Sequence, residues 1–260
     1  MSDLNGKVAL ITGASSGIGA ATAKLFASLG AKLSLSGRNE VNLKLVADEC
    51  KRVGPPDAEP PLMVLAELCS ESDVTNLVDT TIKKFGRLDI LVNNAGIAAI
   101  DTIQSTSLEH YDHVMNTNLR SAFHLTMLCV PHLIETRGNI VNVSSVAGTR
   151  VLHGMLLNSM SKAAMDQMTS CTALELASKG VRVNSVNPGV IVTSIHHSLG
   201  VSDEDNAKFM QTAKEHHPLG RVGDPEEVAK AISFLASSNA SFITGEHFHV
   251  DGGLHTVCWR

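Results

Sequence analysis

Short apolar runs alternate with longer stretches of helical periodicity from one end of the chain to the other. Most of these runs are continuous and β-branched, which is typical of strands covered on both faces. Repeated strand–helix–strand units predict an α/β fold with a doubly wound parallel sheet and right-handed crossovers. Strands are expected at 8–12, 32–36, 62–66, 89–93, 139–144, 182–186 and 248–250, and helices near 17–29, 40–52, 73–85, 108–135, 156–179 and 225–236.

Residues 194–217 interrupt this alternation, because they are polar, rich in histidine and poorly patterned. A long segment of this kind inside a compact domain is usually functional or mobile. We therefore expect a mobile loop that covers a substrate, with Ile195, Leu199 and Met210 as its apolar contacts. No repeat or long linker divides the chain, so residues 1–260 are predicted to form one domain around one core.

Composition narrows the class of protein. The net charge is −5 with both signs scattered, so no basic face for nucleic acid is expected. The apolar runs are too short or too mixed to cross a bilayer, and residues 1–7 lack the pattern of a secretory signal. The five cysteines are far apart, which favours free thiols in a reducing cytosol. Histidines occur as adjacent pairs at 196–197 and 216–217, and no carboxylate or cysteine lies at metal-ligand spacing from them. This pattern argues against a metal site. These features predict a cytoplasmic protein.

A glycine-rich stretch, TGASSGIG at 12–19, follows the first expected strand and opens the first expected helix. Glycines let the backbone turn tightly and approach a pyrophosphate, which then lies at the positive end of the helix. The strand–turn–helix context favours a dinucleotide site over an ordinary glycine turn. The predicted contacts are Gly13, Ser15, Ser16, Gly17, Ile18 and Gly19.

The end of the second expected strand indicates which dinucleotide binds. A site for NAD usually places Asp or Glu about twenty residues after the glycine loop, to hold the ribose 2′-hydroxyl. Here Gly37 is followed by Arg38 and Asn39. A guanidinium pairs with a 2′-phosphate, whereas a carboxylate repels it. We expect Arg38 and Asn39 to contact NADP(H), which is favoured over NAD(H); the alternative is a solvated surface arginine.

Further motifs follow the glycine-rich stretch in order along the chain. They are NNAG at 93–96, Asn118 in MNTNL, VSSVAG at 143–148, SK at 161–162, NPG at 187–189 and ITGEHFHVDGG at 243–253. With these motifs and TGASSGIG at 12–19, the chain resembles the classical short-chain dehydrogenase/reductase family from residue 7 to residue 253.

The resemblance implies a single Rossmann domain with a seven-stranded parallel sheet. In the family the helices near 108–135 and 156–179 pair across subunits and the last strand builds a second interface, which implies a homotetramer or dimer.

The resemblance also implies roles for individual residues. Ser145 would bind the substrate oxygen, Asn118 would hold a water in a proton relay, and Lys162 would bind the nicotinamide ribose. Glu67 stands where the family usually has Asp, beside the adenine amino group. The remaining cofactor contacts implied are Leu68, Asn94, Ala95 and Gly96 along the adenosine half, and Pro188, Gly189, Ile191 and Thr193 around the nicotinamide.

One position departs from the family. The spacing of Ser145, Asn158 and Lys162 normally holds serine, tyrosine and lysine, and Asn158 takes the place of the tyrosine. A lysine four residues along a helix shares one face with that position and makes a phenol a usable acid. A carboxamide orients a carbonyl but does not protonate an alkoxide at neutral pH. The only tyrosine, Tyr111, precedes Asn118, and His153 is a proton donor or simply a loop residue.

Three explanations of Asn158 remain open. The protein is a slow reductase that uses a water relayed from Lys162 and Asn118, or a cofactor-binding regulator or scaffold that has lost catalysis, or an ordinary enzyme altered at this position. General acid catalysis is typically worth about 10²–10⁴-fold, so its loss leaves orientation and electrostatics in place. We therefore expect an oxidoreductase that acts on a moderately hydrophobic ketone or secondary alcohol.

Overall fold

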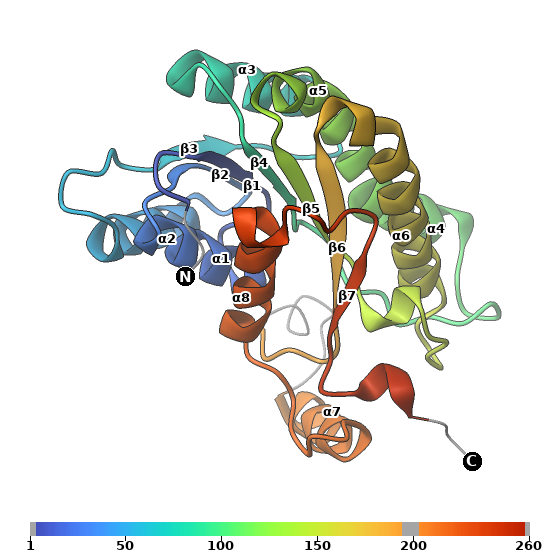
Figure 1. The fold of residues 1–260 in the computed structure, drawn as a ribbon. Helices are drawn as coiled ribbons and strands as arrows, with labels where there is room; N and C mark the ends of the chain where they lie inside the picture. The colour runs from blue at the N-terminus through green and yellow to red at the C-terminus, as the bar shows by residue number, and fades with distance from the viewer. Residues whose placement is uncertain (1–3, 194–202, 258–260) are drawn as a thin grey trace.

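The computed structural model describes residues 4–193 and 203–257 as a three-layer α/β fold (Figure 1). All seven strands are parallel, in the order β3-β2-β1-β4-β5-β6-β7, so the predicted doubly wound sheet is confirmed. β1 lies between β2 and β4, where the strand order reverses. The strands are β1 (Val8–Ile11), β2 (Lys32–Gly37), β3 (Leu62–Leu65), β4 (Ile90–Asn93), β5 (Asn139–Val143), β6 (Arg182–Pro188) and β7 (His247–Val250).

Helices cover both faces of the sheet (Figure 1). One face is covered by α1, α2 and α8, which pack against one another, and the other by α3, α4, α5 and α6. The helices are α1 (Gly17–Ser28), α2 (Glu40–Val53), α3 (Glu71–Phe85), α4 (Leu108–Met115), α5 (Ser121–Thr136), α6 (Leu156–Leu176), α7 (Asp203–His216) and α8 (Pro225–Ala236).

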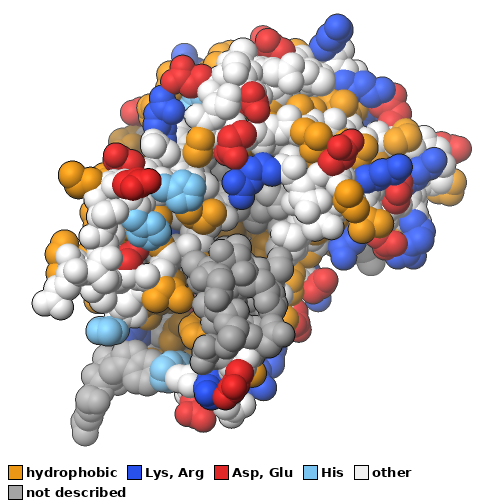
Figure 2. All heavy atoms as spheres, turned by 180° about the vertical axis from the view of Figure 1, so that it is seen from behind, with side chains coloured by type: hydrophobic (Ala, Val, Ile, Leu, Met, Phe, Trp, Pro, Cys, Tyr) orange, Lys and Arg blue, Asp and Glu red, His pale blue; other side chains and the backbone are white. Residues whose placement is uncertain are grey.

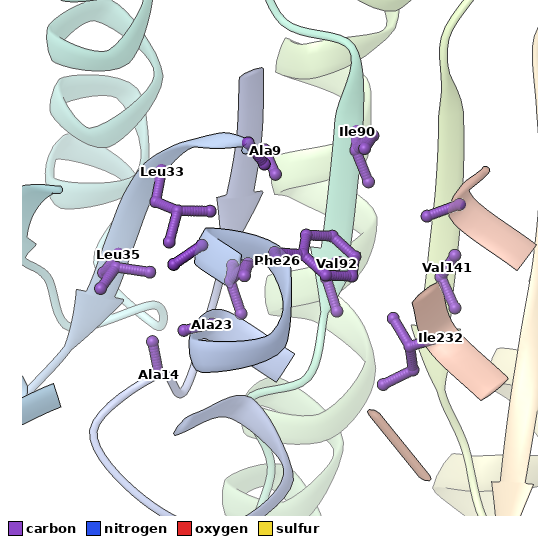
Figure 3. Close-up of a cluster of buried hydrophobic side chains, with 14 of the residues drawn as sticks. Ala9, Ala14, Ala23, Phe26, Leu33, Leu35, Ile90, Val92, Val141 and Ile232 are labelled. Carbon is purple, nitrogen blue, oxygen red and sulfur yellow. The ribbon is translucent and has the colours of Figure 1, made fainter. Parts of the chain in front are cut away.

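The continuous apolar runs are explained by two hydrophobic cores, one on each face of the sheet. In β1, Ala9 and Ile11 belong to the core under α1 and α8, whereas Val8 and Leu10 belong to the core on the opposite face. Successive side chains of a strand point to opposite faces, so a strand buried on both sides shows no alternation of apolar and polar positions. Figure 3 shows the first core, in which Phe26 of α1 lies among side chains of β1, β2 and β4.

Two elements differ from the sequence prediction. The expected helix over 108–135 is interrupted by a π-helical turn, Asn116–Arg120, between α4 and α5. π turns are rare and often occur at functional sites. The segment expected to be irregular contains α7, in which Ala213 is the only buried side chain among those described. A helix that buries so little has no apolar stripe for a sequence pattern to detect.

The surface seen from behind carries acidic and basic side chains interspersed with one another (Figure 2). Among the described residues, no helix is long and apolar enough to cross a membrane. Residues 4–193 and 203–257 also contain no group of three or more histidine, cysteine or acidic side chains arranged to hold a metal ion.

Candidate active site

A cleft of about 470 Å³ opens at the carboxyl ends of the strands, beside the point where the strand order reverses. Ligands of open α/β sheets bind at this place. The structure brings most of the predicted residues together there. Those that line the cleft are Gly13, Ser15, Ser16, Gly17, Ile18, Arg38, Asn39, Glu67, Leu68, Asn94, Ala95, Gly96, Ser145, Asn158, Lys162, Pro188, Gly189, Ile191 and Thr193. Gly19 and Asn118 do not line it.

The glycine loop is closely packed against the segment that follows β4. Gly13 has a φ of 62°, and a Cβ built on it would lie 2.8 Å from Nδ2 of Asn94 and 2.9 Å from Cα of Ala95. Thr12 connects the two segments, because its hydroxyl oxygen accepts from the backbone N–H of Asn94 at 3.0 Å and of Ala95 at 3.1 Å. Gly19 supports this loop from behind, where a Cβ would collide with the carbonyl oxygen of Gly13.

The loop fits the pyrophosphate of a dinucleotide. Ser16 precedes α1 in an extended conformation, and its side chain does not cap the helix. The hydroxyl of Ser16 therefore accepts no hydrogen bond from the first N–H groups of α1, which face the cleft. Unpaired N–H groups and the helix dipole favour an anion at this end. Gly17, with a φ of 53°, leaves the backbone accessible beside Thr193. A β-carbon at Gly17 would lie 3.1 Å from Cγ2 of Thr193 and would narrow this space.

Arg38 and Glu67 meet at the mouth of the cleft. Nη1 of Arg38 lies 3.3 Å from Oε2 of Glu67, and the two side chains are 66% and 46% exposed. A pair this exposed contributes little to stability, so the guanidinium can exchange partners. Asn39 has a structural role as well, because its side chain accepts from the N–H of Asn42 at 2.9 Å and caps α2.

Lys162 is held inside the protein with its ammonium at the cleft wall. Its side chain is buried, and Nζ donates to the carbonyl of Val143 at 2.8 Å. Burial lowers the pKa of Lys162 to about 8, and the charge of Asp166 acts weakly in the opposite direction. The ammonium is therefore mostly charged at neutral pH and is positioned by α6 and the end of β5 together.

Ser145 and Asn158 line the same cleft as Lys162. The hydroxyl oxygen of Ser145 accepts from the N–H of Ala147 at 3.1 Å. Asn158 is 6% exposed, and its main-chain carbonyl accepts from the hydroxyl of Ser161 at 2.9 Å. Within the described chain, no hydrogen bond is made by the carboxamide of Asn158.

Asn118 lies in the π turn, and its side chain forms hydrogen bonds with two other segments. Its Oδ1 accepts from the N–H of Ile97 at 2.8 Å, and its Nδ2 donates to the carbonyl of Ile97 at 3.0 Å and to the hydroxyl of Ser161 at 3.2 Å. Ser161 in turn bonds to Asn158. The side chain of Asn118 therefore ties the segment after β4 to the second turn of α6. Its part in a proton relay stays a prediction.

Neither alternative acid lines the cleft. His153 is exposed in the loop before α6 and is absent from the lining. Tyr111 is partly buried on α4, where it packs against a small cluster of Ala99, Val114 and Leu157. The geometry thus leaves position 158 without a replacement from either residue.

An apolar wall of the cleft was missed by sequence reasoning. It consists of Leu152, Met155, Phe209 and Leu254, which come from the loop before α6, from α7 and from the carboxyl-terminal segment. Phe209 takes the place predicted for Met210, which does not line the cleft, while Ile195 and Leu199 lie outside the described residues. One signal was present, because Phe209 is the only Phe, Trp or Tyr within 194–217.

The comparisons with known proteins agree with this fold. A family model described as "Enoyl-(Acyl carrier protein) reductase" matches residues 13–255. The 3-oxoacyl-[acyl-carrier-protein] reductase FabG of Thermotoga maritima is 41% identical over 252 residues, which cover 96% of this chain and 98% of that protein. The FabG protein of Rickettsia prowazekii is 38% identical over 258 residues, which cover 99% of this chain and 100% of that protein.

Solved structures extend the likeness to three dimensions. A short-chain dehydrogenase/reductase of unknown function from Caenorhabditis elegans, determined with cofactor, superposes with a TM-score of 0.91 at 36% identity, covering 98% of this chain and 97% of that one. A short-chain type dehydrogenase/reductase from Mycobacterium marinum gives a TM-score of 0.89 at 32% identity and covers 97% and 96%. The chain belongs to the short-chain dehydrogenase/reductase family of oxidoreductases.

Proposed function

We propose that this chain is an NADP(H)-dependent oxidoreductase that acts on a carbonyl compound or secondary alcohol of moderately hydrophobic character. One observation carries the proposal: a single cleft joins the glycine loop to Ser145, Asn158 and Lys162. The apolar wall of Leu152, Met155, Phe209 and Leu254 supports a substrate with an apolar body.

Each group in the cleft has a task that its chemistry allows. The glycine loop and the amino end of α1 bind a pyrophosphate, and Lys162 binds ribose hydroxyls and adds positive charge. Ser145 donates a hydrogen bond to the substrate oxygen, where negative charge develops. Asn158 orients the same oxygen but supplies no proton. A nicotinamide, when bound, supplies or accepts the hydride equivalent.

The names of the similar proteins suggest two kinds of bond as the site of reduction. The FabG relatives are named as 3-oxoacyl reductases, which reduce a ketone, and the family model is named for an enoyl reductase, which reduces a carbon–carbon double bond. Both names describe acyl substrates, which suits the apolar wall. The acyl class is therefore the first to test.

Two measurements test the proposal. Calorimetry should detect NADPH binding to the purified protein, and a panel of ketones, enones and secondary alcohols should contain at least one compound that is turned over. NADPH binding without turnover of any compound would favour the second candidate, a cofactor-binding regulator or scaffold. That candidate is supported by Asn158, which has no ionisable proton to give. Failure to bind either nucleotide would contradict both.

Arg38 is expected to set the nucleotide preference. Arg38→Asp should weaken NADPH binding about tenfold and should favour NADH, since it removes a partner of the 2′-phosphate and supplies an acceptor for the 2′-hydroxyl. The effect lies at the lower end for a charged hydrogen bond because Arg38 is exposed and already paired with Glu67. Calorimetric titration with both nucleotides measures it.

Arg52→Asp is the matched control. Arg52 is also exposed and also paired with a glutamate, Glu49, but it lies at the end of α2 away from the cleft. This variant should keep the nucleotide preference of the parent protein. Equal or tighter binding of NADH by the parent would refute the role given to Arg38.

The protein is expected to form a symmetric oligomer. Large apolar side chains are exposed on α5 and α6, namely Phe123, Met127 and Leu174, and on the edge strand β7, namely Phe248. Faces of this kind are buried when identical subunits pair. Light scattering at micromolar concentration should give a mass that is a multiple of 27.6 kDa. A clean monomer would contradict the expectation.

A further inference from the structure

His217 is a buried histidine just beyond the carboxyl end of α7. It is 3% exposed and follows His216, the last residue of the helix. α7 itself buries little, because Ala213 is its only buried side chain among those described. A helix with so few buried contacts opens easily by local unfolding. His217 therefore anchors the carboxyl end of α7 to the rest of the protein.

Both ring nitrogens of His217 have a hydrogen-bond partner. Nδ1 lies 2.6 Å from the carbonyl oxygen of Ala213, and Nε2 lies 3.2 Å from the backbone nitrogen of Val190 in the loop after β6. A carbonyl only accepts and a backbone N–H only donates. Nδ1 must therefore carry the hydrogen and Nε2 must accept, so one neutral form of the ring satisfies both partners. The imidazole bridges α7 and the loop after β6.

Two glycines allow the backbone to approach this ring closely. A Cβ built on Gly189 would lie 2.7 Å from Nε2 of His217, and one built on Gly252 would lie 3.4 Å from its Cδ2. The carbonyl of Gly252 also accepts from the N–H of Leu219 at 3.2 Å. The segments that follow β6 and β7 thus enclose the ring, and they fix its position independently of α7.

The loop that His217 holds is part of the cleft wall, whereas His217 itself is not. Gly189, Val190 and Ile191 line the cleft. Val190 and Ile191 also line a second cavity of about 460 Å³, and His217 belongs to the lining of that second cavity. The ring therefore acts on the cleft only through this loop.

The backbone bonds of the loop decide what it presents to the cleft. The carbonyl of Val190 accepts from the N–H of Gly223, and the N–H of Val192 donates to the carbonyl of Gly223, both at 2.9 Å. In such a parallel bridge the N–H and carbonyl of the residue between, Ile191, point away from Gly223. Among the described residues these two groups have no hydrogen-bond partner. A ligand in the cleft can therefore bond to them.

We propose that His217 is a positioning residue that couples α7 to the loop at Ile191, and through this loop to a nucleotide bound in the cleft. Phe209, earlier on α7, lines the same cleft, so the bridge also joins the apolar wall to this loop. Ordering of α7 and binding of the nucleotide then favour each other. The inference rests on the proposed function, which supplies the nucleotide.

The size of the coupling follows from linkage. A nucleotide that steadies the loop at Ile191 steadies α7 through His217, and an ordered α7 raises the affinity for the nucleotide by the same factor. Couplings between sites typically amount to about 5–150-fold. Because His217 lies outside the cleft lining, its replacement should remove the coupling without removing a contact to the nucleotide.

Hydrogen exchange read by mass spectrometry, with and without saturating NADPH, measures the coupling on the whole protein. In the parent, NADPH should slow exchange in the peptide that covers Asp203–His216 by about fivefold or more. In His217→Leu, which keeps a buried apolar side chain without either nitrogen, NADPH should no longer protect this peptide. Calorimetry should show that NADPH binding is weakened by about the same factor. His216→Leu changes the exposed neighbour and should behave as the parent.

Two further variants separate hydrogen bonding from packing. His217→Gln places a carboxamide oxygen near the site of Nε2, so it can still accept from Val190, and its protection of α7 should lie closer to the parent than to His217→Leu. His217→Asn keeps a donor for Ala213 but does not reach Val190, and it replaces His217→Leu should that protein fail to fold. Equal behaviour of His217→Gln and His217→Leu would mean that the ring acts by packing alone and would overturn the assignment.

The outcomes also separate this inference from the proposed function. NADPH that binds but protects α7 equally in the parent and in His217→Leu, or does not protect it in the parent, would overturn the coupling and leave the proposed function standing. Failure of the parent to bind either NADPH or NADH would overturn both.

Discussion

Asn158→Tyr should raise the rate of saturated-ketone reduction by about 10²–10⁴-fold, the usual worth of a positioned acid. The new phenol would lie one helical turn from Lys162, whose ammonium is already fixed on the carbonyl of Val143. A cation at that distance lowers the pKa of a phenol and makes it a usable proton donor. The cleft beside position 158 has room for the larger ring.

Single-turnover reduction by bound NADPH, followed across pH in both proteins, measures this gain. Asn158→Phe is the control, because it adds the ring without the hydroxyl, and its rate should not exceed that of the parent protein. Equal rates in the parent and in Asn158→Tyr would mean that another group already delivers the proton. His153 would then be the first residue to mutate, although it is exposed and outside the cleft lining.

Lys162 should make the stability of the nucleotide-free protein rise with pH in the alkaline range. Burial lowers the pKa of Lys162 from 10.5 to about 8, so between these values the unfolded chain holds a proton that the folded chain has released. Stability rises with pH wherever the unfolded state binds more protons. The free energy of unfolding should therefore gain about 3 kcal/mol from this residue between pH 8 and 10.5.

The gain is measured as a difference between proteins. Denaturant unfolding of the parent and of Lys162→Met at several pH values cancels the titration of all other groups, and the difference should grow from pH 8 upward. Lys230→Met removes a charge from an exposed position on α8 and should show no such trend. A difference that stays flat across this range would mean that Lys162 titrates at its ordinary pKa in the folded protein.

The fold was predictable because its central strands are buried on both faces. Val8 and Leu10 pack on one side of the sheet while Ala9 and Ile11 pack on the other, which leaves an unbroken apolar run in the sequence. The π turn was not predictable, since its one added residue barely disturbs the apolar spacing of the two helices that flank it. α7 was missed because it buries almost nothing among its described side chains.

The two halves of the site also differ in how far the sequence predicts them. The glycine loop is contiguous in sequence, so its geometry at Gly13 and Gly17 could be predicted from a motif. The apolar wall is assembled from distant segments, and nothing local marks Leu254 as its neighbour. The pairing of Arg38 with Glu67 also depends on side-chain directions at the ends of adjacent strands, which the sequence does not contain.

The carboxyl-terminal segment has a practical consequence for anyone who makes this protein. Leu254 lines the cleft, and Nη1 of Arg150 holds its carbonyl at 2.6 Å. A fusion on the carboxyl-terminal side would therefore be attached to a segment that builds the apolar wall of the cleft. A fusion on the amino-terminal side would be joined ahead of β1, at the opposite edge of the sheet from the cleft. Kinetic work should therefore use amino-terminal fusions.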